Sequence, residues 1–195
     1  MTIMNRKNIK KSRTLSGWVR ARFFPDCIVS SPDKIDFEAL AAKGFRIVLI
    51  DIDNTLAFHG SKTCDTFAKL IIDRIEDSSL CPVIVSNARV ERARTYAASL
   101  GISFIAHAKK PGIKTICRDL VQRNCPCEKA LMVGDQLLTD VWSARRAGIP
   151  VILTERRSSR EIFTVRIKRT IESLLILLGG RSHWNDLKGE CHDRL

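Results

Sequence analysis

The chain has 195 residues, the length of one domain, and its 45% hydrophobic and 28% charged content is typical of a soluble globular protein. Its charge is less usual, because 33 Lys and Arg against 21 Asp and Glu give a net charge of +12 and a pI near 9.7. This surplus favours polyanionic partners such as nucleic acid, anionic lipid or phosphorylated substrates.

The predicted elements alternate between helices and strands. After a linker over 23–33, we expect, in chain order, a helix over 35–43, a strand over 45–50, a helix over 63–77, a strand over 83–85, a helix over 89–100, a strand over 103–106, a helix over 113–123, a strand over 131–133, a helix over 138–147, a strand over 151–153 and a helix over 162–178. This alternation predicts an α/β, Rossmann-like three-layer sandwich with about five parallel strands. Ligands of such sheets bind beyond the carboxyl ends of the strands.

The last predicted helix carries Ile167, Ile171, Leu174 and Leu178 at helical spacing, with basic residues close by. Such a stripe either packs on the sheet or contacts a membrane surface. We expect it to pack on the sheet. No run of 18 apolar residues occurs, so the sequence predicts no membrane-spanning segment.

The basic residues gather at the start of the chain. Residues 1–25 hold seven basic and no acidic residues, which predicts a leader that is disordered, lies on a membrane surface or serves organelle import. On a membrane, Trp18, Phe23 and Phe24 would insert at the interface. We expect the folded domain over 26–180 and a polar tail over 181–195.

The seven cysteines form an odd set without a repeating spacing, and no apolar secretion signal precedes them. We therefore expect reduced thiols. Cys125 and Cys127 are the only close pair, and no second pair follows that would complete a zinc site.

Two acids follow the first predicted strand, in Asp51-Ile52-Asp53-Asn54-Thr55. Alternate residues of an extended chain point to the same side, and unpaired charge beside an apolar core is costly. A bound metal ion would remove this cost. A turn or a helix cap is the simpler alternative for this segment alone.

Polar residues also follow the later strands. Ser86 and Asn87 precede a helix, where they suit either phosphate or an N-cap. Lys110 can pair with a phosphoryl oxygen. Asp135 would lie beside Asp51 if their two strands are neighbours, and converging carboxylates suit Mg²⁺.

In this order, Asp51-x-Asp53-x-Thr55, Ser86, Lys110 and Gly134-Asp135-x₄-Asp140 resemble the four motifs of the haloacid dehalogenase (HAD) superfamily. The resemblance implies a Mg²⁺-dependent phosphatase with an aspartyl-phosphate intermediate. It assigns these roles: Asp51 as nucleophile, Asp53 as general acid and base, Ser86, Asn87, Lys110 and Thr55 as phosphate-binding residues, Asp51, Asp53 and Asp135 as metal ligands, and Asp140 and Asn54 as supporting residues. A proton donor must be protonated for part of the cycle, so we expect a raised pKa for Asp53.

The intervals between the motifs each hold one helix and one strand, so no cap domain fits. An open site favours macromolecular or surface-held substrates.

A closer resemblance, over 23–178, is to the YqeG-type family of HAD subfamily IIIA, which includes phosphatidylglycerophosphate phosphatases. It rests on Phe24-Pro25-Asp26, Lys110-Pro111 and Gly134-Asp135-Gln136-x-x-Thr139-Asp140-Val141, whereas Phe58-His59-Gly60 departs from the family. The resemblance implies a cytoplasmic, peripheral membrane enzyme that produces phosphatidylglycerol. The alternatives are a soluble HAD phosphatase for sugar or amino-acid phosphates and a non-catalytic RNA- or ribosome-binding protein.

Overall fold

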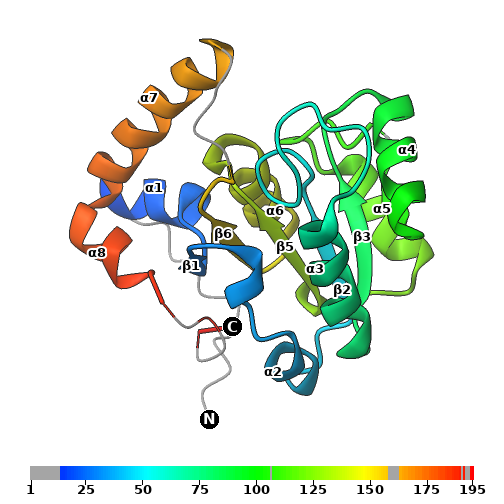
Figure 1. Cartoon of the computed structure of the whole chain (residues 1–195). Coiled ribbons are helices and arrows are strands. Elements are labelled where there is room, and N and C mark those ends of the chain that lie inside the picture. The colour runs from blue at the N-terminus through cyan, green and yellow to red at the C-terminus, as the bar shows by residue number, and fades with distance from the viewer. Residues whose placement is uncertain (1–13, 106, 158–162, 190, 192–193) are drawn as a thin grey trace.

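The computed structural model describes residues 14–105, 107–157, 163–189, 191 and 194–195. One sheet of six strands forms its centre, in the order β1-β6-β5-β2-β3-β4, and every neighbouring pair is parallel (Figure 1). The strands are β1 (Cys27–Val29), β2 (Ile47–Ile50), β3 (Cys81–Val85), β4 (Ser103–Ile105), β5 (Ala130–Gly134) and β6 (Val151–Thr154).

The predicted α/β class with a parallel sheet is confirmed, but the expected number of five strands was one too few. The missing strand is β1, which lies in the segment predicted as a linker and pairs with β6 at the sheet edge. Three residues are too few to show the periodicity of a strand. Their burial becomes clear only when β6 lies beside them.

Helices cover both faces of the sheet (Figure 1). The face with Val48 and Ile50 packs against α2, α3 and α4, and the face with Ile47 and Leu49 packs against α1, α5 and α6. The helices are α1 (Leu15–Phe23), α2 (Phe37–Ala42), α3 (Thr66–Asp77), α4 (Val90–Leu100), α5 (Lys114–Gln122), α6 (Trp142–Ala147), α7 (Phe163–Gly179) and α8 (Arg181–Asp186). Alternate residues of each central strand therefore supply two separate cores.

At the carboxyl ends of the strands, the loop from β2 to α3 covers residues 51–65 and the loop from β3 to α4 covers residues 86–89. Residues 51–105, all of which the structure describes, contain α3, α4 and the strands between them and no inserted domain. None of the described helices has the length and the apolar content needed to cross a bilayer.

The start of the described chain is ordered rather than tail-like. α1 packs between α6 and α7, with Val19 and Phe23 buried. Phe24 is also buried and lies edge-on to Trp184, with ring centroids 5.1 Å apart. The expectation that Phe23 and Phe24 insert at a membrane interface was therefore wrong, because both rings fill the core. Trp18 alone of the three is exposed.

The expectation that the apolar stripe of the last helix packs on the sheet was also wrong. Ile171, Leu174 and Leu178 are exposed, and the buried side of α7 carries Glu172 and Gly179 instead. The side chain of Ile167 is outside the described part of the structure. The segment is helical as expected, but the face of α7 that packs inward is the one opposite the apolar stripe.

A disulfide joins Cys27 of β1 to Cys191, with the two Cα atoms 5.4 Å apart. The expectation of reduced thiols was therefore wrong for this pair, while the other five cysteines are free. The two partners are 164 residues apart, so no local spacing signals their contact.

Candidate active site

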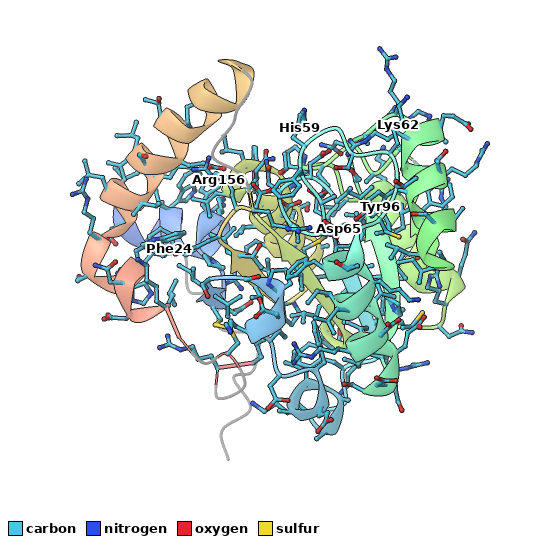
Figure 2. The ribbon with its side chains drawn as sticks, in the orientation of Figure 1. Phe24, His59, Lys62, Asp65, Tyr96 and Arg156 are labelled. Atoms are coloured by element: carbon cyan, nitrogen blue, oxygen red, sulfur yellow. A yellow bond between two sulfur atoms is a disulfide. The ribbon has the colours of Figure 1, made fainter. Side chains whose placement is uncertain are left out.

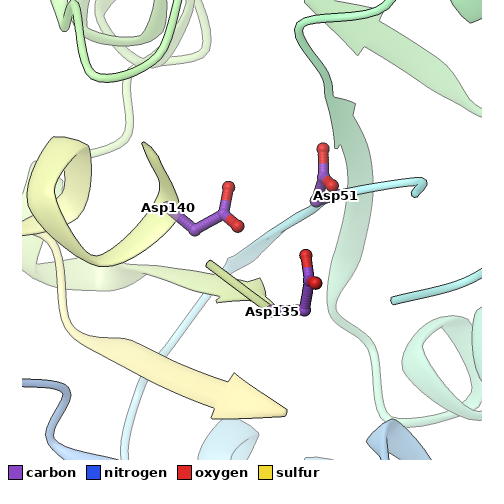
Figure 3. Close-up of side chains that lie close together, drawn as sticks. All are labelled: Asp51, Asp135 and Asp140. Atoms are coloured by element: carbon purple, nitrogen blue, oxygen red, sulfur yellow. The ribbon is translucent and has the colours of Figure 1, made fainter. Parts of the chain in front are cut away.

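Three buried carboxylates meet at the carboxyl edge of the sheet. β2 and β5 are neighbours, and the Asp51 N–H donates to the Val133 carbonyl over 3.0 Å. One carboxylate oxygen each from Asp51, Asp135 and Asp140 lies within 4.8 Å of the others (Figure 3). We call these residues the acidic cluster. Hard oxygen donors at this separation fit Mg²⁺.

A glycine allows the cluster to form. β5 ends at Gly134, and the π-helical turn Leu137–Val141 that follows folds Asp140 back over it. A Cβ on Gly134 would overlap the Asp140 carboxyl group. Asp140 is further held by the Gln136 N–H, which donates to its Oδ2 over 3.1 Å. Close approach of backbone and carboxylate therefore requires glycine at this position.

Lys110 supplies the cation of the cluster. Its Nζ donates to Asp51 Oδ1 over 2.8 Å and to Asp140 Oδ1 over 2.5 Å. Burial alone would lower the pKa of Lys110, but the two carboxylates raise it, so the ammonium stays charged. Three carboxyl groups share this one ammonium in a buried site, and a divalent cation would help to balance their negative charge.

Burial acts in the opposite direction on Asp51. It raises the pKa of Asp51 to about 6, although the adjacent Lys110 works against this shift. A cation at the acidic cluster would favour the ionised form, which is the form that can act as a nucleophile.

Two buried polar atoms beside the cluster have no hydrogen-bond partner in the described part of the chain: Asn54 Oδ1 and Thr55 Oγ1. Asn54 also has a positive φ of 60°, a backbone conformation that asparagine tolerates better than most residues. Buried polar atoms are nearly always satisfied. Both atoms are therefore suited to a metal-bound water or a phosphoryl group.

Ser86 and Asn87 follow β3, and their side chains make different hydrogen bonds. Ser86 is buried and accepts a hydrogen bond from the Ala88 N–H. The Asn87 side chain instead donates to the Lys110 carbonyl over 2.8 Å and accepts from the Lys110 N–H over 2.7 Å. Asn87 therefore positions the lysine rather than presenting its amide to phosphate.

Asp53 does not join the acidic cluster. Both of its oxygens accept hydrogen bonds from Arg92 of α4, each 2.7 Å long, and the Gly60 N–H donates to Oδ1 over 3.0 Å. His59 Nδ1 lies 3.4 Å from the same oxygen. Burial alone would raise the pKa of Asp53, but these donors lower it below the ordinary value. The expected raised pKa of Asp53 was therefore wrong for this state of the site.

Residues 13–156 match the family described as mitochondrial PGP phosphatase. The chain belongs to this family. It is accordingly a phosphatase, as the motifs implied.

Three relatives resemble the phosphatase along most of its length. Probable phosphatase YqeG of Bacillus subtilis (strain 168) is 29% identical over 79% of this chain and 90% of its own. The chloroplastic phosphatidylglycerophosphate phosphatase 1 of Chlamydomonas reinhardtii is 30% identical over 76% of this chain and 60% of its own. The chloroplastic/mitochondrial phosphatidylglycerophosphate phosphatase 1 of Arabidopsis thaliana is 29% identical over 73% and 44%. The chain thus spans about half the length of the two longer relatives.

Two arginines that sequence reasoning missed hold the loop after β2 in the phosphatase. Arg92 donates two hydrogen bonds to Asp53. Arg157 lies in the segment after β6. The Arg157 guanidinium donates to the Leu56 carbonyl, lies 3.0 Å from Asp65 and stacks 4.2 Å from the centre of the Phe67 ring. No local pattern marks either arginine, because each reaches a partner from a different strand or helix.

Proposed function

We propose that this phosphatase hydrolyses the phosphomonoester of phosphatidylglycerophosphate, releases phosphatidylglycerol and uses Mg²⁺. The observation that carries the proposal is the acidic cluster with its buried lysine, since this charge set fits a divalent cation and a phosphoryl group together. The names of the chloroplast-targeted relatives supply the substrate class.

In the first step, Asp51 Oδ attacks phosphorus, and the bond from phosphorus to the glycerol oxygen breaks as the aspartyl-phosphate forms. Asp53 gives its proton to the departing alkoxide. Lys110 and the Thr55 hydroxyl hold the phosphoryl oxygens. Mg²⁺, held by Asp51 and Asp135 with Asp140 in support, would offset the charge that gathers on those oxygens.

In the second step, a water attacks the same phosphorus, Asp53 accepts the proton of the water, and Asp51 leaves with its carboxylate restored. The hydrogen bonds from Arg92 lower the pKa of Asp53 and so favour the carboxylate, the form that can accept a proton. For the first step Asp53 must carry a proton, so Arg92 has to give up at least one of its hydrogen bonds.

The substrate lies in a bilayer, so we propose that the phosphatase works as a peripheral membrane protein. Residues 1–25 carry seven basic residues and no acid. Basic residues near anionic lipid each contribute about 1 kcal/mol of attraction. Import into an organelle is consistent with the named compartments of two relatives.

The proposal is tested by measuring phosphate release from phosphatidylglycerophosphate in mixed micelles, with Mg²⁺ or with EDTA. We expect Mg²⁺-dependent release that falls about 10³-fold or more in Asp51→Asn, and no change in Asp73→Asn, an exposed acid on α3. Turnover of an aryl phosphate without turnover of the lipid would reject the substrate. Full activity of Asp51→Asn would reject the mechanism.

A further inference from the structure

α7 carries apolar side chains on two sides, and within the described fold only the side with Leu175 and Ile176 packs against the core. The inner face lies against the body, where Gly179 is so close to the Phe24 ring that a Cβ would overlap it. The outer face carries Ile171, Leu174, Leu177 and Leu178, which are exposed by 45%, 53%, 56% and 38%. A surface helix of a soluble protein normally turns polar residues to this side.

These side chains form the main concentration of exposed apolar surface in the described part of the chain. Six of its nine exposed large apolar side chains lie on α7 or on α1, which packs beside it (Figure 1). The other three, Phe58, Leu70 and Val121, lie on separate elements. Contiguous exposed apolar surface marks an interaction site more often than scattered residues do.

The charges carried by α7 and by α1, which packs against it, select among possible partners. α1 contains Arg20 and Arg22 and no acid, and the only acid of α7, Glu172, is buried on the inner side. A second copy of this chain would bring the same positive charge to the same face, which disfavours self-association. Nucleic acid is bound by cations and stacking aromatic rings, and the four aliphatic side chains of the outer face supply neither.

Apolar side chains bordered by basic ones are the composition by which a helix lies on an anionic bilayer. We infer that the outer face of α7, formed by Ile171, Leu174, Leu177 and Leu178, is the surface that docks this phosphatase on an anionic lipid bilayer. The inference rests on the proposed lipid substrate and adds the place at which the enzyme meets it. Figure 2 labels Phe24, whose ring Gly179 of α7 approaches from the inner side of this helix.

The inner face of the same helix reaches the catalytic edge. Glu172 accepts hydrogen bonds from the N–H groups of Leu137 and Leu138, over 2.8 and 3.4 Å, in the turn that follows Asp135. A cavity of about 420 Å³ lies here, lined by Glu172, Ile176 and Asp135 among others. A lipid at the outer face is thus about one helix diameter, roughly 10 Å, from a cavity that borders the acidic cluster.

The test measures co-sedimentation of the full chain with vesicles of phosphatidylglycerol and phosphatidylcholine. We expect the Leu174→Gln/Leu177→Gln variant to bind at least about tenfold more weakly than wild type, since it loses two exposed leucines that would become buried in the lipid. The matched control is Leu70→Gln/Val121→Gln, whose parent side chains are 52% and 74% exposed on α3 and α5. The control is expected to bind as wild type does. Thermal unfolding of each variant verifies that it is folded.

Wild-type binding by the α7 variant, or no binding by wild type, would overturn the inference. So would a vesicle-free wild-type dimer that the α7 variant converts to a monomer, because a second copy would then cover the face. A third outcome combines two results: the variant binds vesicles more weakly, and the wild type does not hydrolyse phosphatidylglycerophosphate. This outcome would uphold the docking face and reject the substrate proposal. The two failures are therefore distinguishable.

Discussion

At the scale of single residues, the pair of Asp53 and Arg92 determines the resting state of the site. The guanidinium reaches from α4 with both hydrogen bonds made, and both side chains are largely buried. Bidentate pairs of this kind fix orientation as well as charge. Arg92 therefore favours the ionised form of the Asp53 carboxylate and fixes its orientation.

Replacing Arg92 by Met leaves the Asp53 carboxylate without its main partner, so we expect the free energy of unfolding at pH 7 to fall by about 1–3 kcal/mol. Because the folded pKa of Asp53 lies below its ordinary value of 3.8, the pair stabilises the fold above that pH. Its contribution is lost as the pH falls through the folded pKa. Urea unfolding of both proteins should therefore show a smaller difference in the free energy of unfolding near pH 3 than at pH 7.

The control for this measurement is Arg94→Met on the same helix, whose pair with Glu91 is exposed. Exposed pairs contribute little, so this change should be close to neutral. A difference between wild type and Arg92→Met that stayed constant from pH 7 to pH 3 would contradict the assigned role.

At the scale of elements, α7 is joined by hydrogen bonds to the π-helical turn after β5. Glu172 satisfies two N–H groups at the start of that turn, where no residue of the turn itself caps them. The turn carries Asp140 and follows Asp135, so the position of the helix and the geometry of the acidic cluster are linked. Uncapped N–H groups at the start of a helical turn are costly when buried.

Glu172→Ala would leave these N–H groups unsatisfied. We expect the free energy of unfolding to fall by about 1–3 kcal/mol and Mg²⁺ to bind more weakly, as measured by urea unfolding and titration calorimetry. Glu172→Gln keeps an oxygen acceptor at the same place and should recover most of both losses. Equal behaviour of the two variants would show that the charge of Glu172, and not its hydrogen bonds, matters.

At the scale of the whole molecule, the two described ends of the chain meet. α1 packs against α7, and the disulfide attaches Cys191 to β1 at the edge of the sheet. The cross-link closes a loop of 164 residues. Long closed loops restrict the unfolded chain strongly, so the covalent link stabilises the fold without contacting the acidic cluster.

Cys191→Ser should lower the free energy of unfolding by about 2–4 kcal/mol. Urea unfolding with and without a reductant tests this. The reductant should lower the free energy of unfolding of the wild type to that of the variant, and should leave the value of the variant unchanged. Cys117→Ser, which removes a free thiol, is the matched control. A wild type whose stability is insensitive to reductant would contradict the prediction.

Much of the fold and the site was predictable because the signals are local. The apolar run before Asp51 marks β2, the glycines Gly101 and Gly148 end α4 and α6 in left-handed geometry, and the acids follow their strands directly. β1 was missed because a three-residue strand carries no period. The pKa of Asp53 was misjudged because its partner lies 39 residues away.

The sequence by itself determined the class of fold, the order of β2 to β6 along the chain and which polar residues stand at the ends of these strands, since propensity, periodicity and turn chemistry act over a few residues. Only the tertiary structure decided that β5 lies beside β2, which brings Asp135 to Asp51. It also decided which face of α7 is buried and which cysteines meet. These outcomes depend on packing between distant segments, where many pairings satisfy the same local pattern and the total burial selects one.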